Sequence, residues 1–176
     1  DDIYVDNQPM SSGSSNDSDE PSSDFETRNS AGLTLQDHLS WQLNLTPMTA
    51  RDKLIATTLV DAIDSNGMLT MTIEAIVSGL NNEQGQTGIE EDEVLAVLHR
   101  VQQFDPIGVG YRDLRECLSI QIRQFDAGYP GVAIAIRIID EFLPQLASHD
   151  YNTIMRRLRI KEAELKESMD VILTLN

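Results

Sequence analysis

The chain has 176 residues, 29 of them acidic and 13 basic, and a net charge of −16 at pH 7. Apolar residues make up 40% but aromatic residues only 5%, which suits a core of packed helices better than a β-sandwich. The single cysteine excludes an internal disulfide, and no apolar run approaches the roughly 20 residues that a membrane span requires. We therefore expect an all-α protein of a reducing compartment, the cytoplasm, with no membrane span.

The first 31 residues show no apolar period. Residues 1–32 hold eight acids and one base, and the stretch 11–21 is rich in Ser and Asp. Such a composition buries too little apolar surface to offset its ordering entropy. We expect residues 1–31 to form a disordered acidic linker. The functional alternative is an acidic tail that competes with nucleic acid for a basic channel.

Apolar residues at helical spacing begin at Leu33 and predict four helices as far as residue 105. Thr34 is placed to cap the first helix and Thr49 begins the second, and Pro47 separates them. Four acids at 90–93 begin the fourth, where the helix dipole favours negative charge. We expect these helices to run from Thr34 to Pro47, from Thr49 to Gly67, from about 70 to 80 and from 90 to 104.

A break at residues 105–110 separates these helices from four more. Their expected ranges are 111–126, 132–147, 150–159 and 161–175. Pro144 should kink or restart the second of them, because proline cannot donate a backbone hydrogen bond. Leu114 and Phe125 in the first, and Leu173 in the last, are expected to face inward. The predicted architecture is all-α, with about eight helices in two small packed groups at residues 32–105 and 106–176.

Residues 54–76 follow the order helix, short glycine turn, helix, which predicts a first group similar to a helix-turn-helix. A DNA reader carries bases on and around its second helix. Residues 68–80 instead contain Glu74 and neither Lys nor Arg. A helix-turn-helix DNA-binding transcription regulator that uses residues 54–80 stays as the alternative function. Binding to duplex DNA with a steep salt dependence would distinguish it.

No residue pattern predicts a catalytic, cofactor-binding or metal site. Cys117 falls at a core position of a predicted helix, so a buried thiol is favoured over a nucleophile. His38, His99 and His149 are far apart and lack the spacing of metal ligands on one helix. The glycines at 108–110 follow no strand and lack the third glycine of a phosphate-binding loop. We expect a protein that is not an enzyme and needs no cofactor.

Basic residues gather at two places in the last third of the chain. Arg112 and Arg115 alternate with acids, which is typical of a solvated helix face that pairs its own charges. The second place holds four cations within six residues, without acids between them: Arg156, Arg157, Arg159 and Lys161. For this basic cluster, docking on an acidic protein surface or a phosphate backbone and an ordinary solubilising surface both stay open.

The segment from Phe104 to Leu118 reads FDPIGVGYRDLRECL. It closely resembles a hallmark of sigma-54 factors, which carry Phe-Asp-Pro-x-Gly-Val and then a basic residue followed by Asp-Leu-x-Glu/Asp-Cys-Leu. The stretches 35–39, 63–69 and 149–151 are also similar to this family, so the resemblance runs collinearly over about residues 33–176. Tyr111 departs from the pattern, because family members commonly carry a small residue there.

The resemblance implies a helical core-binding domain that contacts the β and β′ subunits of core RNA polymerase. It also implies that the preceding acidic linker can run along the downstream DNA channel. The chain begins without Met and stops inside an apolar-periodic segment, so we expect a fragment, monomeric on its own. Promoter DNA would be contacted mainly by domains outside it, and the activator-responsive segment would also lie outside.

We hypothesise that nine residues contact the polymerase. They are Asp105, Pro106, Gly108, Arg112, Arg115, Arg156, Arg157, Arg159 and Lys161. For the turn at 105–108, a purely structural role in closing two helices is the alternative.

Overall fold

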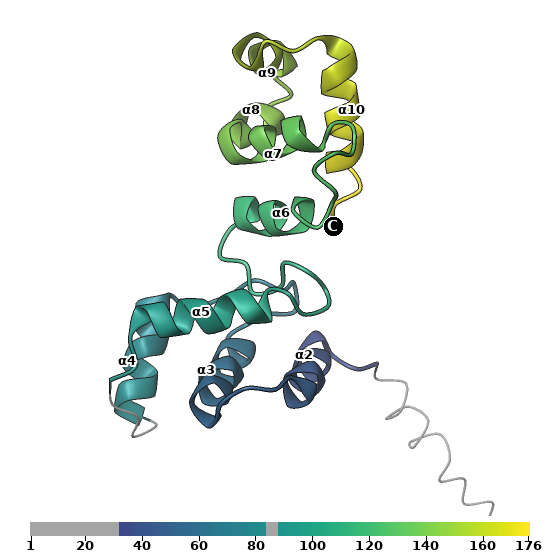
Figure 1. Cartoon of the computed structure of the whole chain (residues 1–176). Coiled ribbons are helices and arrows are strands. Elements are labelled where there is room, and N and C mark those ends of the chain that lie inside the picture. Colours follow the sequence, from purple (N-terminus) through teal and green to yellow (C-terminus); the bar gives the residue numbers. More distant parts are fainter. Residues whose placement is uncertain (1–31, 84–87) are drawn as a thin grey trace, which may run out of the picture. The chain divides into compact units, whose positions relative to one another are not determined.

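The computed structural model describes residues 32–83 and 88–176 (Figure 1). Nine α-helices lie in these ranges, together with two isolated β-bridges, Ile63 with Leu69 and Met68 with Tyr111. The all-α prediction is confirmed, with nine described helices where about eight were expected. The predicted disordered linker, residues 1–31, lies outside the described residues.

The first group of helices comprises α2 (Leu35–Leu45), α3 (Ala50–Asp61), α4 (Ile73–Glu83) and α5 (Glu91–Val101). Helix α3 packs against α2 and α5, and α4 also packs against α5. Their inward residues form one apolar core. Its most buried members include Leu39, Ile55, Leu59, Ile76, Leu80, Val94 and Leu98.

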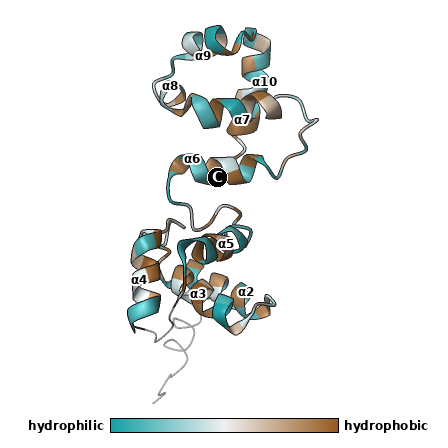
Figure 2. Cartoon of the chain, turned by 60° about the vertical axis from the view of Figure 1, so that its left-hand side comes forward, coloured by the Kyte–Doolittle hydropathy of each residue, from teal (hydrophilic) through white to brown (hydrophobic). Residues whose placement is uncertain are grey.

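The second group comprises α6 (Leu114–Ile122), α7 (Val132–Glu141), α8 (Leu143–Ala147), α9 (Tyr151–Leu158) and α10 (Glu162–Ile172). Helix α7 packs against α6 on one side and α10 on another, and α8 packs against α7 and α9. Their separate core includes Ile122, Val132, Ala135, Ile138, Ile139 and Ile154. Figure 2 shows hydrophobic and hydrophilic stretches within each helix, as expected where one face is buried.

The helix predicted at 132–147 is two helices in the structure. Helix α7 ends at Glu141, Phe142 takes a non-helical conformation, and α8 begins at Leu143 with Pro144 in its first turn. Pro144 lacks the N–H that would bond to the carbonyl four residues earlier, so the chain restarts there. The restart predicted from Pro144 is confirmed.

The predicted bounds of the helix at 111–126 are wrong, and so is the inward placement of Leu114 and Phe125, whereas Cys117 and Ile122 of the same predicted face are buried. Helix α6 begins only at Leu114, because the Asp113 carboxylate accepts a hydrogen bond from the N–H of Glu116 at 2.8 Å and caps the helix. The side chains of Leu114, Phe125 and Leu173 are 59%, 37% and 75% exposed. Phe125 and Leu173 lie beyond the helix ends, where helical spacing no longer decides which side chains are buried.

The connection between α3 and α4 runs from residue 62 to 72, longer than the three or four residues of a helix-turn-helix. Its centre is a tight turn in which Asp64 Oδ1 accepts hydrogen bonds from the N–H groups of Asn66 and Met68 at 2.9 and 3.0 Å. Gly67, with φ of 90°, supplies the left-handed backbone. The glycine turn is present, and the helix-turn-helix-like arrangement stays unconfirmed.

Three side-chain amides each bond through both of their polar atoms to the backbone of a distant residue. Each ties a helix to a segment outside it, at donor–acceptor distances between 2.7 and 3.1 Å. The pairs are Gln42 with Asp105, Asn81 with Ile89 and Gln121 with Asn176. We call them the amide ties.

Candidate functional site

Asp105 and Pro106, joined by a cis peptide bond, lie in the turn after α5 and are bound to α2. The amide of Gln42 bonds to both backbone groups of Asp105. The Asp105 carboxylate also lies 3.1 Å from Nε2 of His38. Both turn residues are exposed, so a partner has access to them. Their backbone nevertheless already serves to join two helices.

Gly108 is buried and takes a φ of 90°. Its N–H donates to the carbonyl of Gln102 at 2.9 Å. A Cβ atom at this position would lie 3.2 Å from the carbonyl oxygen of Cys117, so the turn packs closely on α6. This burial favours the structural role for Gly108 over contact with a partner.

Arg112 is paired with Glu116 at the start of α6. Its Nη2 lies 2.7 Å from Oε1 of Glu116, and its backbone N–H donates to Oε2, also at 2.7 Å. Burial raises the pKa of Glu116, but hydrogen bonds from Arg112 and Gln102, together with the positive charge of Arg112, outweigh burial and hold this pKa below its ordinary value of 4.5. The self-pairing expected from the alternating signs is therefore seen for Arg112. Arg115 is exposed and, within the described residues, forms no ion pair.

The basic cluster lies at the junction of α9 and α10. Arg156 and Arg157 are in the last turn of α9, Arg159 follows in a left-handed conformation with φ of 56°, and Lys161 precedes α10. Helix α9 buries Ile154 and Leu158, Arg156 lies on the opposite face, and Arg157 lies at the edge of the buried one. All four are exposed, and none forms an ion pair with any residue in 32–83 or 88–176.

Asp150 fixes the start of α9 beside this cluster. Its Oδ1 accepts a hydrogen bond from the N–H of Thr153 at 3.2 Å. Hydrogen bonds from Thr153 lower the pKa of Asp150, and the positive charge of Arg156 lowers it further. The carboxylate thus caps the helix without taking a cation out of the cluster.

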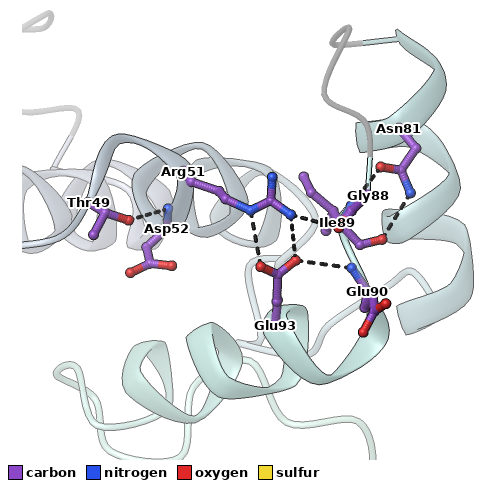
Figure 3. A network of polar contacts seen from close by, with 8 residues as sticks. All are labelled: Thr49, Arg51, Asp52, Asn81, Gly88, Ile89, Glu90 and Glu93. Atoms are coloured by element: carbon purple, nitrogen blue, oxygen red, sulfur yellow. Dashed lines mark hydrogen bonds and ion pairs between the residues drawn. The ribbon is translucent and has the colours of Figure 1, made fainter.

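A charge network between α3 and α5 was missed by sequence reasoning (Figure 3). Arg51 donates from Nε and Nη2 to the two carboxylate oxygens of Glu93 at 3.1 and 2.8 Å, and from Nη2 to the carbonyl of Gly88 at 2.7 Å. Hydrogen bonding to Arg51 is the main cause of the lowered pKa of Glu93. The four-acid start of α5 is therefore partly neutralised by a residue 42 positions earlier, which no local spacing indicates.

An exposed apolar face on α2 was also missed. Trp41 is 59% exposed and stacks on His38, with ring centroids 6.2 Å apart, while Leu45 one turn later is 66% exposed. The signal was available, because Trp41 and Leu45 lie off the stripe formed by Leu39 and Leu43, which are buried.

The described part of the chain offers few side chains suited to a metal site or to a nucleophilic cysteine. It contains no group of three or more His, Cys, Asp or Glu side chains placed to hold a metal ion. Cys117 is buried, and burial raises the pKa of its thiol, which disfavours the nucleophilic thiolate. Among the helices of the described residues, none is long and apolar enough to cross a membrane.

Comparison with known families bears directly on the resemblance seen at Phe104 to Leu118. The family model described as sigma-54 factor, core binding domain, matches residues 24–176. The chain belongs to this family. The resemblance inferred from the sequence is confirmed.

Sigma-54 relatives match most of this chain. It is 50% identical over 175 residues to the RNA polymerase sigma-54 factor of Pseudomonas putida, covering 99% of this chain and 34% of that protein. It is 48% identical over 143 residues to that of Escherichia coli K12, covering 81% and 29%. The factor of Azotobacter vinelandii is 46% identical over 158 residues, covering 90% and 31%. The chain thus spans about a third of the length of the curated relatives it matches.

Proposed function

We propose that this chain binds core RNA polymerase, through its β and β′ subunits, during bacterial transcription initiation. It tethers to the polymerase the promoter-reading and activator-responsive parts of a longer sigma-54 factor. The observation that carries the proposal is the match of residues 24–176 to a family whose description is core binding. The relatives, roughly three times as long, are named RNA polymerase sigma-54 factors. In this proposal the chain acts by binding and catalyses no reaction.

The basic cluster is the proposed positively charged part of the polymerase interface. Its four cations are exposed and, within the described residues, free of ion pairs, so a partner's acids need not displace an existing contact. Asp105, Pro106 and Arg115 are exposed and are proposed as further contacts. Arg112 and Gly108 act indirectly, by fixing α6 and the turn before it. Exposed charges at the edge of a protein interface mainly set the association rate and its salt dependence.

The two helical groups are proposed to act as two subdomains, residues 32–105 and 106–176. Each has an apolar core of its own. The first core also includes Val109, so the turn after residue 105 packs with the first group while leading into the second. In this arrangement the turn determines how the first subdomain leads into the second.

Capture by purified core RNA polymerase at several salt concentrations tests the proposal. We expect Arg156→Glu with Arg157→Glu to weaken capture about fivefold at low salt, since exposed charge contacts contribute roughly 1 kcal/mol in total. The matched control is Lys53→Glu with Lys166→Glu, which changes the net charge equally at two exposed lysines outside the basic cluster and should leave capture unchanged.

Two outcomes would contradict different parts of the proposal. Equal capture of the Arg156 and Arg157 variant and the native chain would remove the basic cluster from the interface. Tight binding of duplex DNA by the native chain, with no affinity for core polymerase, would overturn the function itself and favour the DNA-binding alternative. Residues 54–80 contain no Lys or Arg, so we expect only weak duplex binding.

A further inference from the structure

A cleft of about 380 Å³ opens in the second helical group, between the turn that follows α6 and the last turns of α10. Its volume lies within the range of ligand-binding clefts. Two aromatic rings reach solvent there, since Tyr129 is 59% and Phe125 is 37% exposed. The lining residues are Phe125, Tyr129, Pro130, Glu167, Asp170, Val171 and Thr174.

The aromatic wall of the cleft is held in place by backbone contacts. Asp126 Oδ1 accepts a hydrogen bond from the N–H of Gly128 at 2.8 Å, and the carbonyl of Asp126 accepts one from Tyr129 at 2.9 Å. Gly131 lies so close to α10 that a Cβ atom on it would be 2.7 Å from the carbonyl carbon and oxygen of Glu167. The turn and α10 are therefore in direct contact at Gly131, the residue that follows the lining residue Pro130.

The charged side chains that line the cleft are all acidic. Glu167 and Asp170 supply carboxylates, whereas no Lys, Arg or His lines the cleft. Neither carboxylate forms an ion pair with the residues that the structure describes. This contrasts with residues 106–176 as a whole, where nine bases nearly balance ten acids. The cleft thus combines uncompensated negative charge with two aromatic side chains.

A basic side chain matches each of these features. Aromatic faces attract cations through the ring quadrupole, and a carboxylate accepts two parallel hydrogen bonds from a guanidinium group. The methylene stem of arginine or lysine packs on apolar surface such as Val171 while its charged end reaches the carboxylates. An anionic ligand would be repelled, and a purely apolar one would bury two carboxylates without partners, at a large desolvation cost.

We propose that the cleft binds an arginine or lysine side chain, with an adjoining apolar residue, on a segment of the protein partner. The partner is core RNA polymerase, and in this respect the inference rests on the proposed function. The cleft then adds an acidic, aromatic contact to the positively charged contact of the basic cluster. The two contacts would select opposite charges at two places on the same partner.

Short peptides test the cleft without the polymerase. The 176-residue chain, labelled with ¹⁵N, is titrated with acetyl-Leu-Arg-Leu-amide and with acetyl-Leu-Glu-Leu-amide. We expect saturable shifts for the basic peptide at the amides of Tyr129, Asp170 and Val171, with a Kd of order 1 mM, and none for the acidic peptide. Equal shifts for both peptides, or none at these amides, would overturn the proposal.

Neutral variants and photo-crosslinking test the cleft within the complex. We expect Glu167→Gln with Asp170→Asn to lower affinity for core polymerase about fivefold to tenfold. The control is Glu162→Gln with Asp61→Asn, which makes the same charge change at exposed acids outside the cleft. A photoreactive phenylalanine at position 129 should crosslink to polymerase peptides that contain Arg or Lys. The same group at exposed Leu173, outside the cleft, should not.

The outcomes separate this inference from the proposed function. If the native chain captures polymerase, but the variant in Glu167 and Asp170 binds equally well and position 129 gives no such crosslink, the cleft assignment fails alone. If the native chain fails to capture polymerase while the basic peptide still shifts Tyr129 and Asp170, the proposed function fails and the cleft remains a site for basic segments.

Discussion

Gly131 is the residue on which the approach of α7 to α10 depends. Its φ is 85°, in the left-handed region. A Cβ atom there would lie 2.7 Å from the backbone carbon and oxygen of Glu167 and 2.8 Å from the nitrogen of Ser168. Because these neighbours are backbone atoms, no change of side-chain rotamer relieves the overlap. The contact constrains both the second core and the cleft beside it.

Gly131→Ala should lower the free energy of unfolding by about 2–5 kcal/mol, because the left-handed backbone costs roughly 1–2 kcal/mol and the overlap a further 1–3 kcal/mol. Urea unfolding followed by helical circular dichroism measures the change. The control is Gly79→Ala in α4, where a Cβ atom meets nothing within 4 Å. This substitution should raise stability by about 0.5–1 kcal/mol, since alanine favours the helix. A loss at Gly131 below about 0.5 kcal/mol would contradict the packing described.

Contacts between residues distant in the chain were beyond the reach of sequence reasoning. Arg51 and Glu93 are 42 residues apart, and Gln42 and Asp105 are 63 residues apart. Both contacts depend on how α2, α3 and α5 pack together. Local patterns did suffice for Arg112, whose partner Glu116 is one helical turn away.

At the scale of elements, the capping residues decide where helices begin. Thr34 accepts the capping hydrogen bond expected of it, and Thr49 and Asp150 accept capping hydrogen bonds at the starts of α3 and α9. The start of α6 was placed three residues early, although Asp113 followed three residues later by Glu116 is itself a capping pattern. What the pattern could not give was the burial of side chains beyond the helix ends, such as Phe125, because tertiary packing alone fixes it.

The start of α6 should respond to pH through Glu116. The pKa of Glu116 is lowered in the folded chain, so its stabilising contribution is complete well above its ordinary pKa of 4.5 and is lost as the pH falls below it. Glu116→Gln should cost about 0.5–1 kcal/mol at neutral pH, allowing for the exposure of Arg112. It should also reduce the loss of stability between about pH 5 and pH 3.

Unfolding by urea at a series of pH values measures this effect. The control is Asp61→Asn, since Asp61 is exposed and its carboxylate, in the described part of the chain, forms no ion pair. This variant should keep the native pH dependence. If both variants flatten the pH dependence equally, the pair of Arg112 and Glu116 does not stabilise α6 as described.

At the scale of the whole molecule, the described residues contain two apolar cores that draw on different helices. Leu59 is fully buried in the first and Ile138 in the second. The sequence indicated a division between residues 105 and 106 through its run of proline and glycine. The separation into two cores has another cause, namely which helix faces pack against each other.

Leu59→Ala and Ile138→Ala should each cost about 2–5 kcal/mol, the usual cost of a cavity in a packed core. Hydrogen exchange read by mass spectrometry shows where protection is lost. We expect Leu59→Ala to speed exchange mainly in α2 to α5, and Ile138→Ala mainly in α6 to α10. A uniform increase over all nine described helices in both variants would show that the cores unfold as one unit.

The amide ties have a consequence for how the chain responds to salt. A net charge of −16 makes the molecule repel itself, and this repulsion, like its attraction to partners, weakens as ionic strength rises. Gln42, Asn81 and Gln121 carry no charge, so the joints they make are neither screened by salt nor titrated by acid. A rise in ionic strength can thus weaken the binding of a charged partner without breaking the amide ties. Binding responds to salt, whereas the amide ties that hold the helices in place do not.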